Sequence, residues 1–177
     1  MSEPAKTTRV FFALWPDPKV QSALDLAARQ LHAKCGGRQT RLETIHITLV
    51  FLGEVELEKL KTLQAVAGEV RAQGFEWSLA KFGWWRHNRI AWAGPDAIPP
   101  ALTQLVEQLQ SGLKQAGFEF DQRPYSPHAT LLRKADCRHV ELVGEAIPWK
   151  VSEFVLVRSV LDEKGAAYEI IGRWLLS

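Results

Sequence analysis

The chain has 177 residues, of which 46% are hydrophobic and 24% are charged, so it can bury a sizeable core and has the composition of a soluble globular protein. Its 22 basic and 20 acidic residues leave a net charge of only +2, which excludes a protein that binds polyanions through its overall charge. No uncharged stretch reaches the roughly 20 residues of a membrane-spanning helix, and the polar start does not resemble a secretory signal, so a cytoplasmic protein without membrane contact is expected.

The first half of the chain predicts strands and helices in alternation. Residues 9–14 contain enough β-branched and aromatic residues to indicate a strand. Asp17 suits the N-cap of a helix whose apolar stripe runs to Leu31 and which ends at the following Gly-Gly pair. Residues 45–52 predict the second strand, and residues 57–70 predict the second helix.

The second half predicts hairpins around one further helix. Strands are expected at residues 75–85, 89–93, 124–132, 153–162 and 167–174, and a helix at residues 102–113. Because hairpins and helices are mixed, an α+β fold with antiparallel sheets is preferred to a doubly wound parallel sheet.

The most informative feature is a four-residue phrase that occurs twice, as His46-Ile47-Thr48-Leu49 and as His128-Ala129-Thr130-Leu131. Side chains alternate across a strand, so each copy places its His and its Thr on one face. The copies lie nearly half the chain apart, each with a strand and an amphipathic helix nearby. This spacing predicts two half-domains about a pseudo-twofold axis, with both phrases at a shared central groove.

Three segments together resemble the two-histidine phosphoesterase superfamily and, within it, the RNA 2′,3′-cyclic phosphodiesterase (2′-5′ RNA ligase) family. These segments are residues 9–14, 46–55 and 127–133. The resemblance implies one bilobal domain over residues 1–177, with two antiparallel sheets and flanking helices, in which each lobe contributes one His-x-Thr strand to the groove. It also implies hydrolysis of a terminal 2′,3′-cyclic phosphate of RNA to a 2′-phosphomonoester, with neither a metal nor another cofactor.

Two imidazoles suit this chemistry. A strained cyclic phosphodiester needs only a base that deprotonates water and an acid that protonates the departing oxygen. With ordinary pKa values near 6.5, one imidazole can be neutral while the other is protonated. The resemblance implies that His46 is the proton donor and His128 the proton acceptor; the sequence itself leaves these two roles open. Exchanged roles would allow the reverse joining of a 2′-hydroxyl to a cyclic phosphate.

Five further residues are candidates for substrate binding. The hydroxyls of Thr48 and Thr130 can donate to the non-bridging phosphate oxygens. Arg133 falls on the opposite face from His128 in a regular strand, so it needs a bulge or a strand end to reach the groove. Phe11 and Phe12 alternate, so one belongs to the core and the other can stack on a base, and the sequence does not say which.

No metal site is predicted, because the other three histidines lack paired-ligand spacing. Cys35 and Cys137 are far apart and form no Cys-x-x-Cys motif, so two free thiols are expected. Phosphate-binding loops of the P-loop or Rossmann type are missing.

Two alternatives to the RNA cyclic phosphodiesterase stay open. One keeps the same site but acts on 2′-5′ oligonucleotides or other small cyclic nucleotides. The other is a non-catalytic RNA-binding module, which would have no need of a paired acid and base. The expected partners are RNA 3′-terminal cyclic phosphate ends or nucleotides, and a monomer is expected.

Overall fold

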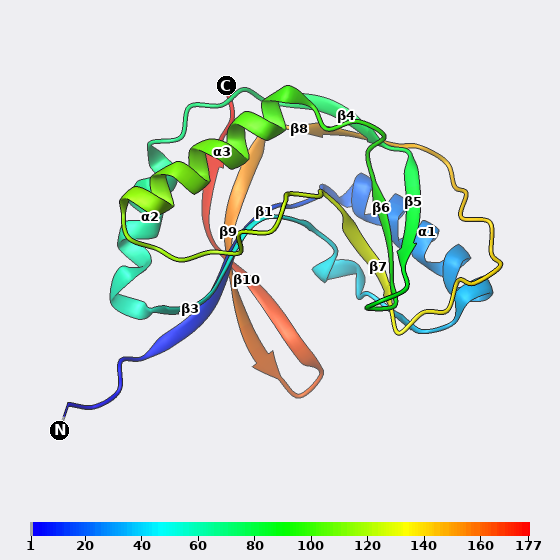
Figure 1. The fold of residues 1–177 in the computed structure, drawn as a ribbon, viewed down its shortest axis with the longest axis horizontal. Coiled ribbons are helices and arrows are strands. Elements are labelled where there is room, and N and C mark those ends of the chain that lie inside the picture. Colours follow the sequence, from blue (N-terminus) through cyan, green and yellow to red (C-terminus); the bar gives the residue numbers. More distant parts are fainter. Residues whose placement is uncertain (1) are drawn as a thin grey trace.

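A computed structural model describes residues 2–177 (Figure 1). Its helices are α1 (Pro18–Cys35), α2 (Leu60–Gly68) and α3 (Pro100–Gln115), with short 3-10 turns η1 (Leu42–Thr44) and η2 (Leu57–Lys59). Its strands are β1 (Thr7–Leu14), β2 (Arg38–Gln39), β3 (Ile47–Glu56), β4 (Phe75–Leu79), β5 (Lys81–Trp85), β6 (Ile90–Gly94), β7 (Ala129–Arg133), β8 (Ile147–Val151), β9 (Glu153–Asp162) and β10 (Gly165–Leu175). The predicted α+β class with antiparallel sheets is confirmed.

The larger sheet is built from two half-sheets that meet at one seam. Its strand order is β10-β9-β1-β3-β7-β6-β5, with β2 added beside β7. β3 and β7 are paired at a single position, Ile47 with Ala129. Both are the first residues of their strands, and each follows a histidine of the repeated phrase. The seam therefore brings the two copies together; the pseudo-twofold axis stays a prediction.

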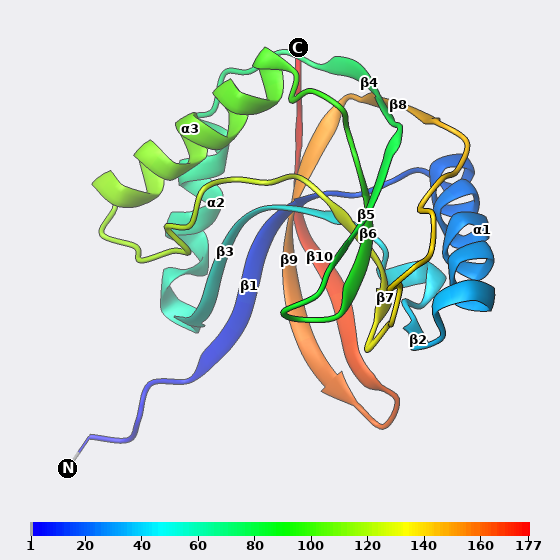
Figure 2. The same ribbon diagram turned by 45° about the vertical axis from the view of Figure 1, so that its right-hand side comes forward.

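The helices cover different half-sheets. α1 packs against β7 and β8, while α2 contacts β10 and α3 contacts β3 (Figures 1 and 2). The predicted cap of α1 is confirmed, since the Asp17 side chain accepts a hydrogen bond of 2.9 Å from the Val20 backbone N–H. None of the helices within residues 2–177 is long and apolar enough to cross a membrane.

Side chains of strand β1 alternate between the two faces of the sheet and pack into a different hydrophobic cluster on each face. Val10, Phe12 and Leu14 are fully buried in the main core. Phe11 and Ala13 point to the other face, where they pack with β9 side chains in a smaller cluster. Phe12 is therefore a core residue, and its inclusion among the substrate-binding candidates was wrong.

Several strand boundaries differ from the predictions for local reasons. Residues 75–85 form two strands, because the chain changes partner at Ala80 and β4 pairs with β8 while β5 pairs with β6. The strand predicted from residue 124 begins only at Ala129, since the prolines in residues 124–127 have no N–H to donate to a neighbour. β8 contains Pro148 and β2 has two residues, and neither was predicted.

The expectation of two free thiols was also wrong, because Cys35 and Cys137 form a disulfide. They are 102 residues apart in sequence, but the pairing of β2 with β7 places the end of α1 beside the segment that follows β7. The Asp136 backbone N–H donates a hydrogen bond of 3.0 Å to the Cys35 carbonyl there. Sequence spacing does not reveal a contact that depends on this tertiary pairing.

Candidate active site

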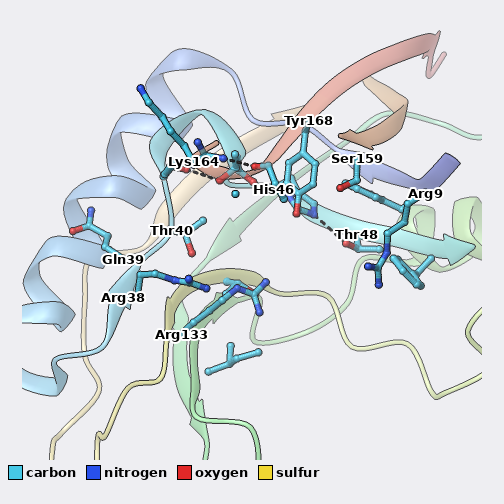
Figure 3. Close-up of a pocket in the computed structure, with 18 of the residues that line it drawn as sticks. Arg9, Arg38, Gln39, Thr40, His46, Thr48, Arg133, Ser159, Lys164 and Tyr168 are labelled. Carbon is cyan, nitrogen blue, oxygen red and sulfur yellow. Dashed lines mark hydrogen bonds between the residues drawn. The ribbon is translucent and has the colours of Figure 1, made fainter. Parts of the chain in front are cut away.

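A pocket of about 570 Å³ lies where the two half-sheets meet (Figure 3). Both half-sheets contribute to its wall, together with the β2 segment and the turn between β9 and β10. Six of the seven residues singled out from the sequence line it: Phe11, His46, Thr48, His128, Thr130 and Arg133. The volume is that of a small-molecule site, larger than a lone phosphate requires.

The two histidines make the same type of hydrogen bond to the backbone. His46 Nδ1 donates to the Thr44 carbonyl at 2.7 Å, and His128 Nδ1 donates to the Ser126 carbonyl at 2.8 Å. A carbonyl can only accept, so the hydrogen sits on Nδ1 in each neutral ring. Each Nε2 therefore carries no hydrogen in the neutral ring and can accept a proton.

The hydroxyl of Thr48 interacts with the neighbouring imidazole. Its Oγ1 lies 3.2 Å from His46 Nε2, as expected for side chains two positions apart on one strand face. In the neutral imidazole Nε2 accepts, so the Thr48 hydroxyl donates to it. Thr130 occupies the corresponding place after His128 and lines the pocket as well.

Aromatic rings enclose His46 on several sides. Trp15 stacks on its imidazole with ring centroids 5.2 Å apart and planes 4° from parallel, and Phe11 stacks at 4.8 Å. Tyr168 contacts the ring edge-on at 5.3 Å. Removal from water disfavours the charged ring and lowers the pKa of His46 to about 4, an effect to which the charges of His128 and Arg133 add.

His128 has a more open environment. Trp85 meets its ring edge-on at 4.6 Å. Desolvation, and then the charge of Arg133, hold the pKa of His128 below its ordinary value. Both imidazoles are therefore neutral at pH 7 in the free protein, whereas the ordinary pKa would have allowed one to be protonated there.

A bulge in β7 brings Arg133 to the pocket. Ala91 pairs with Leu132 and the next β6 residue, Trp92, pairs with Thr130, so Leu131 has no partner on β6. One extra residue reverses the alternation, which is why Leu131 and Leu132 are both fully buried. Arg133 consequently returns to the face of His128, as the sequence required for any contact with the groove.

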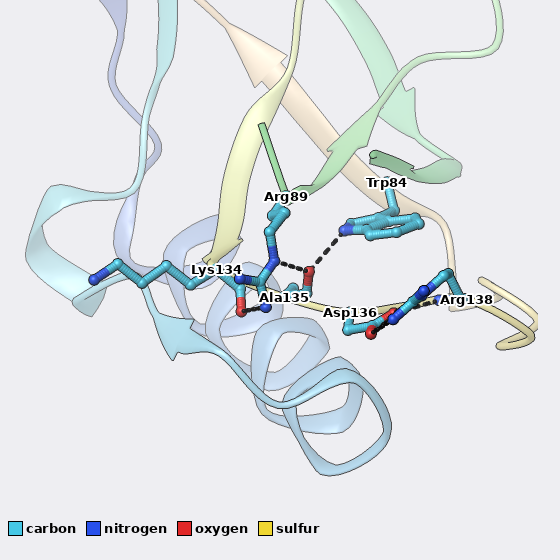
Figure 4. Close-up of polar contacts among 6 residues, drawn as sticks. All are labelled: Trp84, Arg89, Lys134, Ala135, Asp136 and Arg138. Atoms are coloured by element: carbon cyan, nitrogen blue, oxygen red, sulfur yellow. Dashed lines mark hydrogen bonds and ion pairs between the residues drawn. The ribbon is translucent and has the colours of Figure 1, made fainter. Parts of the chain in front are cut away.

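The chain beyond Arg133 is tied to the β5–β6 hairpin (Figure 4). Arg89 donates to the carbonyls of Lys134 and Ala135 at 3.1 and 3.3 Å, and Trp84 Nε1 donates to the Ala135 carbonyl at 3.1 Å. Arg89 and Lys134 both have a positive φ, a conformation rare in non-glycine residues. These bonds hold the end of β7 in place directly after Arg133.

Several residues around the site were not identified from the sequence. Trp15 and Tyr168 surround His46, Trp85 contacts His128, and Arg38 lies next to Arg133 across β2 and β7. For Trp15 a signal existed, because it continues the alternation of Phe11 and Ala13 on the pocket face. The others depend on tertiary pairing. Across residues 2–177, no three His, Cys, Asp or Glu side chains gather in a group that could hold a metal ion.

The sequence matches a family model described as LigT like Phosphoesterase over residues 14–92 and 93–168. Each stretch contains one His-x-Thr-Leu phrase. A protein of Escherichia coli named RNA 2′,3′-cyclic phosphodiesterase is 34% identical, covering 100% of this chain and 99% of the relative. A protein of the same name from Thermus thermophilus is 29% identical, covering 95% of this chain and 90% of that relative.

Solved structures show the same arrangement of the chain. The crystal structure of Escherichia coli LigT complexed with 3′-AMP matches with a TM-score of 0.89 at 32% identity, covering 97% of this chain and 99% of that one. A crystal structure of a Thermus thermophilus protein matches with a TM-score of 0.80 at 27% identity, covering 95% and 97% of the two chains.

Proposed function

This chain belongs to the LigT-like phosphoesterase family of the two-histidine superfamily, and from that membership we propose that it hydrolyses the 2′,3′-cyclic phosphate at RNA 3′ ends to a 2′-phosphomonoester. It is a cyclic phosphodiesterase of this family. The observation that carries the proposal for this chain is the placement of two imidazoles in one pocket, each with its Nδ1 bound to a backbone carbonyl.

In the proposed reaction His128 is the base and His46 the acid. His128 Nε2 takes a proton from water as the water oxygen bonds to phosphorus. The bond from phosphorus to O3′ breaks, and His46 Nε2–H gives its proton to O3′. His46 must be charged at this stage, and a bound phosphodiester anion favours that state because it lies in the same pocket. No metal takes part in these steps.

Hydrogen-bond donors stabilise the transition state in this proposal. Thr48, Thr130 and Arg133 line the pocket beside the imidazoles, and negative charge grows on the non-bridging phosphate oxygens during attack. Phe11 covers one side of His46 and would limit water there. With the roles of the histidines exchanged, the same groups would support the reverse ligation of a 2′-hydroxyl to a cyclic phosphate.

The test uses a short RNA that ends in a 2′,3′-cyclic phosphate, with a chelator present. We expect a 2′-phosphate product, and a loss of about 10²- to 10⁴-fold in kcat for His46→Asn and for His128→Asn. His139→Asn is the matched control, since His139 is exposed, lies outside the pocket and already has a positive φ that asparagine tolerates. A 3′-phosphate product, or full activity in both pocket variants, would contradict the proposal.

The same assay separates the alternatives. Faster turnover of a 2′-5′ linked oligonucleotide would point to that substrate, and RNA binding without turnover at any pH would point to a binding module. A single domain over residues 1–177, a monomeric state and a cytoplasmic location remain predictions. The disulfide argues against the last of these, because cytosolic thiols are normally kept reduced.

A further inference from the structure

Four cationic side chains line the pocket without a polar partner in residues 2–177, and the Arg9 guanidinium lies 5.2 Å from the centre of the Phe51 ring. Arg9, Arg38, Arg133 and Lys164 make no side-chain hydrogen bond or ion pair within residues 2–177, and the pocket lining includes no aspartate or glutamate. Elsewhere arginines have carboxylate partners within 2.7 Å: Arg29, Arg123, Arg138, Arg158 and Arg173. Of the arginines without a polar partner in the described residues, Arg86 lies outside the pocket and the other three line it, as expected where anions bind.

Two of these cations face each other across paired strands. Arg38 of β2 is directly opposite Arg133 of β7 in the antiparallel register. Both line the pocket, and both extend toward the same space (Figure 3). Like charges directly opposite one another destabilise a sheet, so this pairing does not serve stability. An anion bound between or beside the guanidinium groups would offset the repulsion.

The two arginines lie on different strands. Arg133 ends β7, the strand that carries Thr130, and its charge lowers the pKa of both His46 and His128. Arg38 belongs to the neighbouring strand β2, about 5 Å from β7. A pocket of about 570 Å³ has room for a whole nucleotide beyond the reacting phosphate.

We propose that Arg38 binds a second phosphate, the one on the 5′ side of the nucleotide whose cyclic phosphate meets the histidines. The preferred substrates are then nucleotide ends that carry a 5′-phosphate or phosphodiester, rather than nucleoside 2′,3′-cyclic phosphates alone. This inference rests on the proposed function and adds the part of the substrate that the second arginine recognises.

The test compares two cyclic substrates with the same base, one with and one without a 5′-phosphate. For the wild type we expect kcat/KM to be about tenfold or more higher with the 5′-phosphate, mainly through KM, as one charge-assisted contact provides. Arg38→Gln should bring the two substrates to within about twofold of each other, by lowering kcat/KM for the 5′-phosphorylated substrate much more than for the unphosphorylated one. Arg86→Gln, which removes an exposed arginine outside the pocket, should keep the preference.

A binding experiment covers the case in which neither substrate is cleaved. Adenosine 3′,5′-bisphosphate should bind the wild type about tenfold more tightly than adenosine 3′-monophosphate, and Arg38→Gln should remove this difference. An unchanged preference in Arg38→Gln, or an equal loss on both ligands, would overturn the role of Arg38. Cleavage of neither cyclic substrate, with the binding difference intact, would overturn only the proposed reaction.

Discussion

His46 and His128 share a backbone arrangement but differ in their surroundings. Each donates from Nδ1 to a carbonyl two residues earlier, yet three aromatic rings enclose His46 while one contacts His128. Burial favours the uncharged ring, so the more enclosed histidine has the lower pKa. In the proposed reaction His46 becomes charged only when an anion is bound beside it. The imidazolium can then donate its proton to the leaving oxygen.

These pKa values predict different pH optima for kcat/KM, which depends on groups of the free protein, and for kcat, which depends on groups of the substrate-bound protein. The pKa of His46 is about 4 and that of His128 is below 6.5, so the protonated acid disappears from the free protein as the pH rises through this range. We expect a bell-shaped profile of kcat/KM with its maximum below pH 6.5, and limbs that belong to the pair jointly. The kcat optimum should lie at higher pH, because the bound anion favours the charged imidazole.

Both profiles are obtained from initial rates between pH 3.5 and 9, at substrate concentrations below and above KM. Trp15→Leu should shift the acidic limb of the kcat/KM profile to higher pH, because it gives His46 more water. Phe12 lies in the main core on the opposite face of β1, so Phe12→Leu should leave this limb in place despite reduced stability. A kcat/KM maximum at or above pH 7 would disagree with the enclosed state of His46.

Site residues could be predicted where their relation is local in sequence. His46 and Thr48 share a face because they are two positions apart, and the second phrase repeats that spacing. Tyr168 and Arg38 could not be predicted, since they reach the pocket through the pairing of β10 with β9 and of β2 with β7. The choice between Phe11 and Phe12 needed the knowledge of which face of β1 carries the main core.

Among the elements, the two-residue strand β2 depends on a glycine for its approach to β7. Gly37 has a φ of +83°, and a Cβ there would lie 2.5 Å from the Arg133 carbonyl oxygen and 2.9 Å from the Ala135 nitrogen. The neighbouring Gly36 has a φ of +63° but no atom within 4 Å of such a Cβ. Both glycines thus have a positive φ that disfavours an L side chain, and only Gly37 has the close contact.

Alanine substitutions at Gly36 and Gly37 distinguish the effect of the backbone conformation from the effect of the close contact with β7. Gly36→Ala should lower the free energy of unfolding by about 2 kcal/mol, because a φ of +63° with a ψ of −148° is a conformation that L residues rarely adopt. Gly37→Ala should lower it by about 3 kcal/mol and reduce kcat/KM at least tenfold, because moving β2 from β7 displaces Arg38 and Arg133. Urea unfolding and steady-state kinetics measure both effects. Equal results for the two variants would show that the contact at Gly37 has no influence on the site.

The helices could be predicted more fully than the strands. α1 begins at Pro18 behind the Asp17 cap and ends before Gly36, as capping residues next to an apolar stripe indicate. The strands needed information about partners: aromatic residues recur along the whole of residues 75–85, and nothing local shows that the chain leaves one sheet for another at Ala80. A bulge such as that at Leu131 is equally invisible before the neighbouring strand is known.

For the molecule as a whole, the Cys35–Cys137 disulfide closes a loop of 102 residues. Cross-linking restricts the unfolded chain, so its loss should lower the free energy of unfolding by about 2–5 kcal/mol. We expect this loss on adding reductant to the wild type and in Cys137→Ser, measured by the urea midpoint. The double variant Cys35→Ser/Cys137→Ser is the control and should not respond to reductant. Two alkylatable thiols in the untreated protein, with no effect of reductant, would contradict the disulfide.

The pairing of β3 with β7 affects how this activity is maintained in evolution. Each matched stretch, residues 14–92 and residues 93–168, encodes one imidazole and one threonine hydroxyl of the pocket, and the two strands that carry them are paired at a single position. In the proposed chemistry either stretch alone supplies an acid or a base, but not both. Selection for turnover therefore acts on the two stretches as one unit, and a lesion in either phrase removes the advantage of keeping the other.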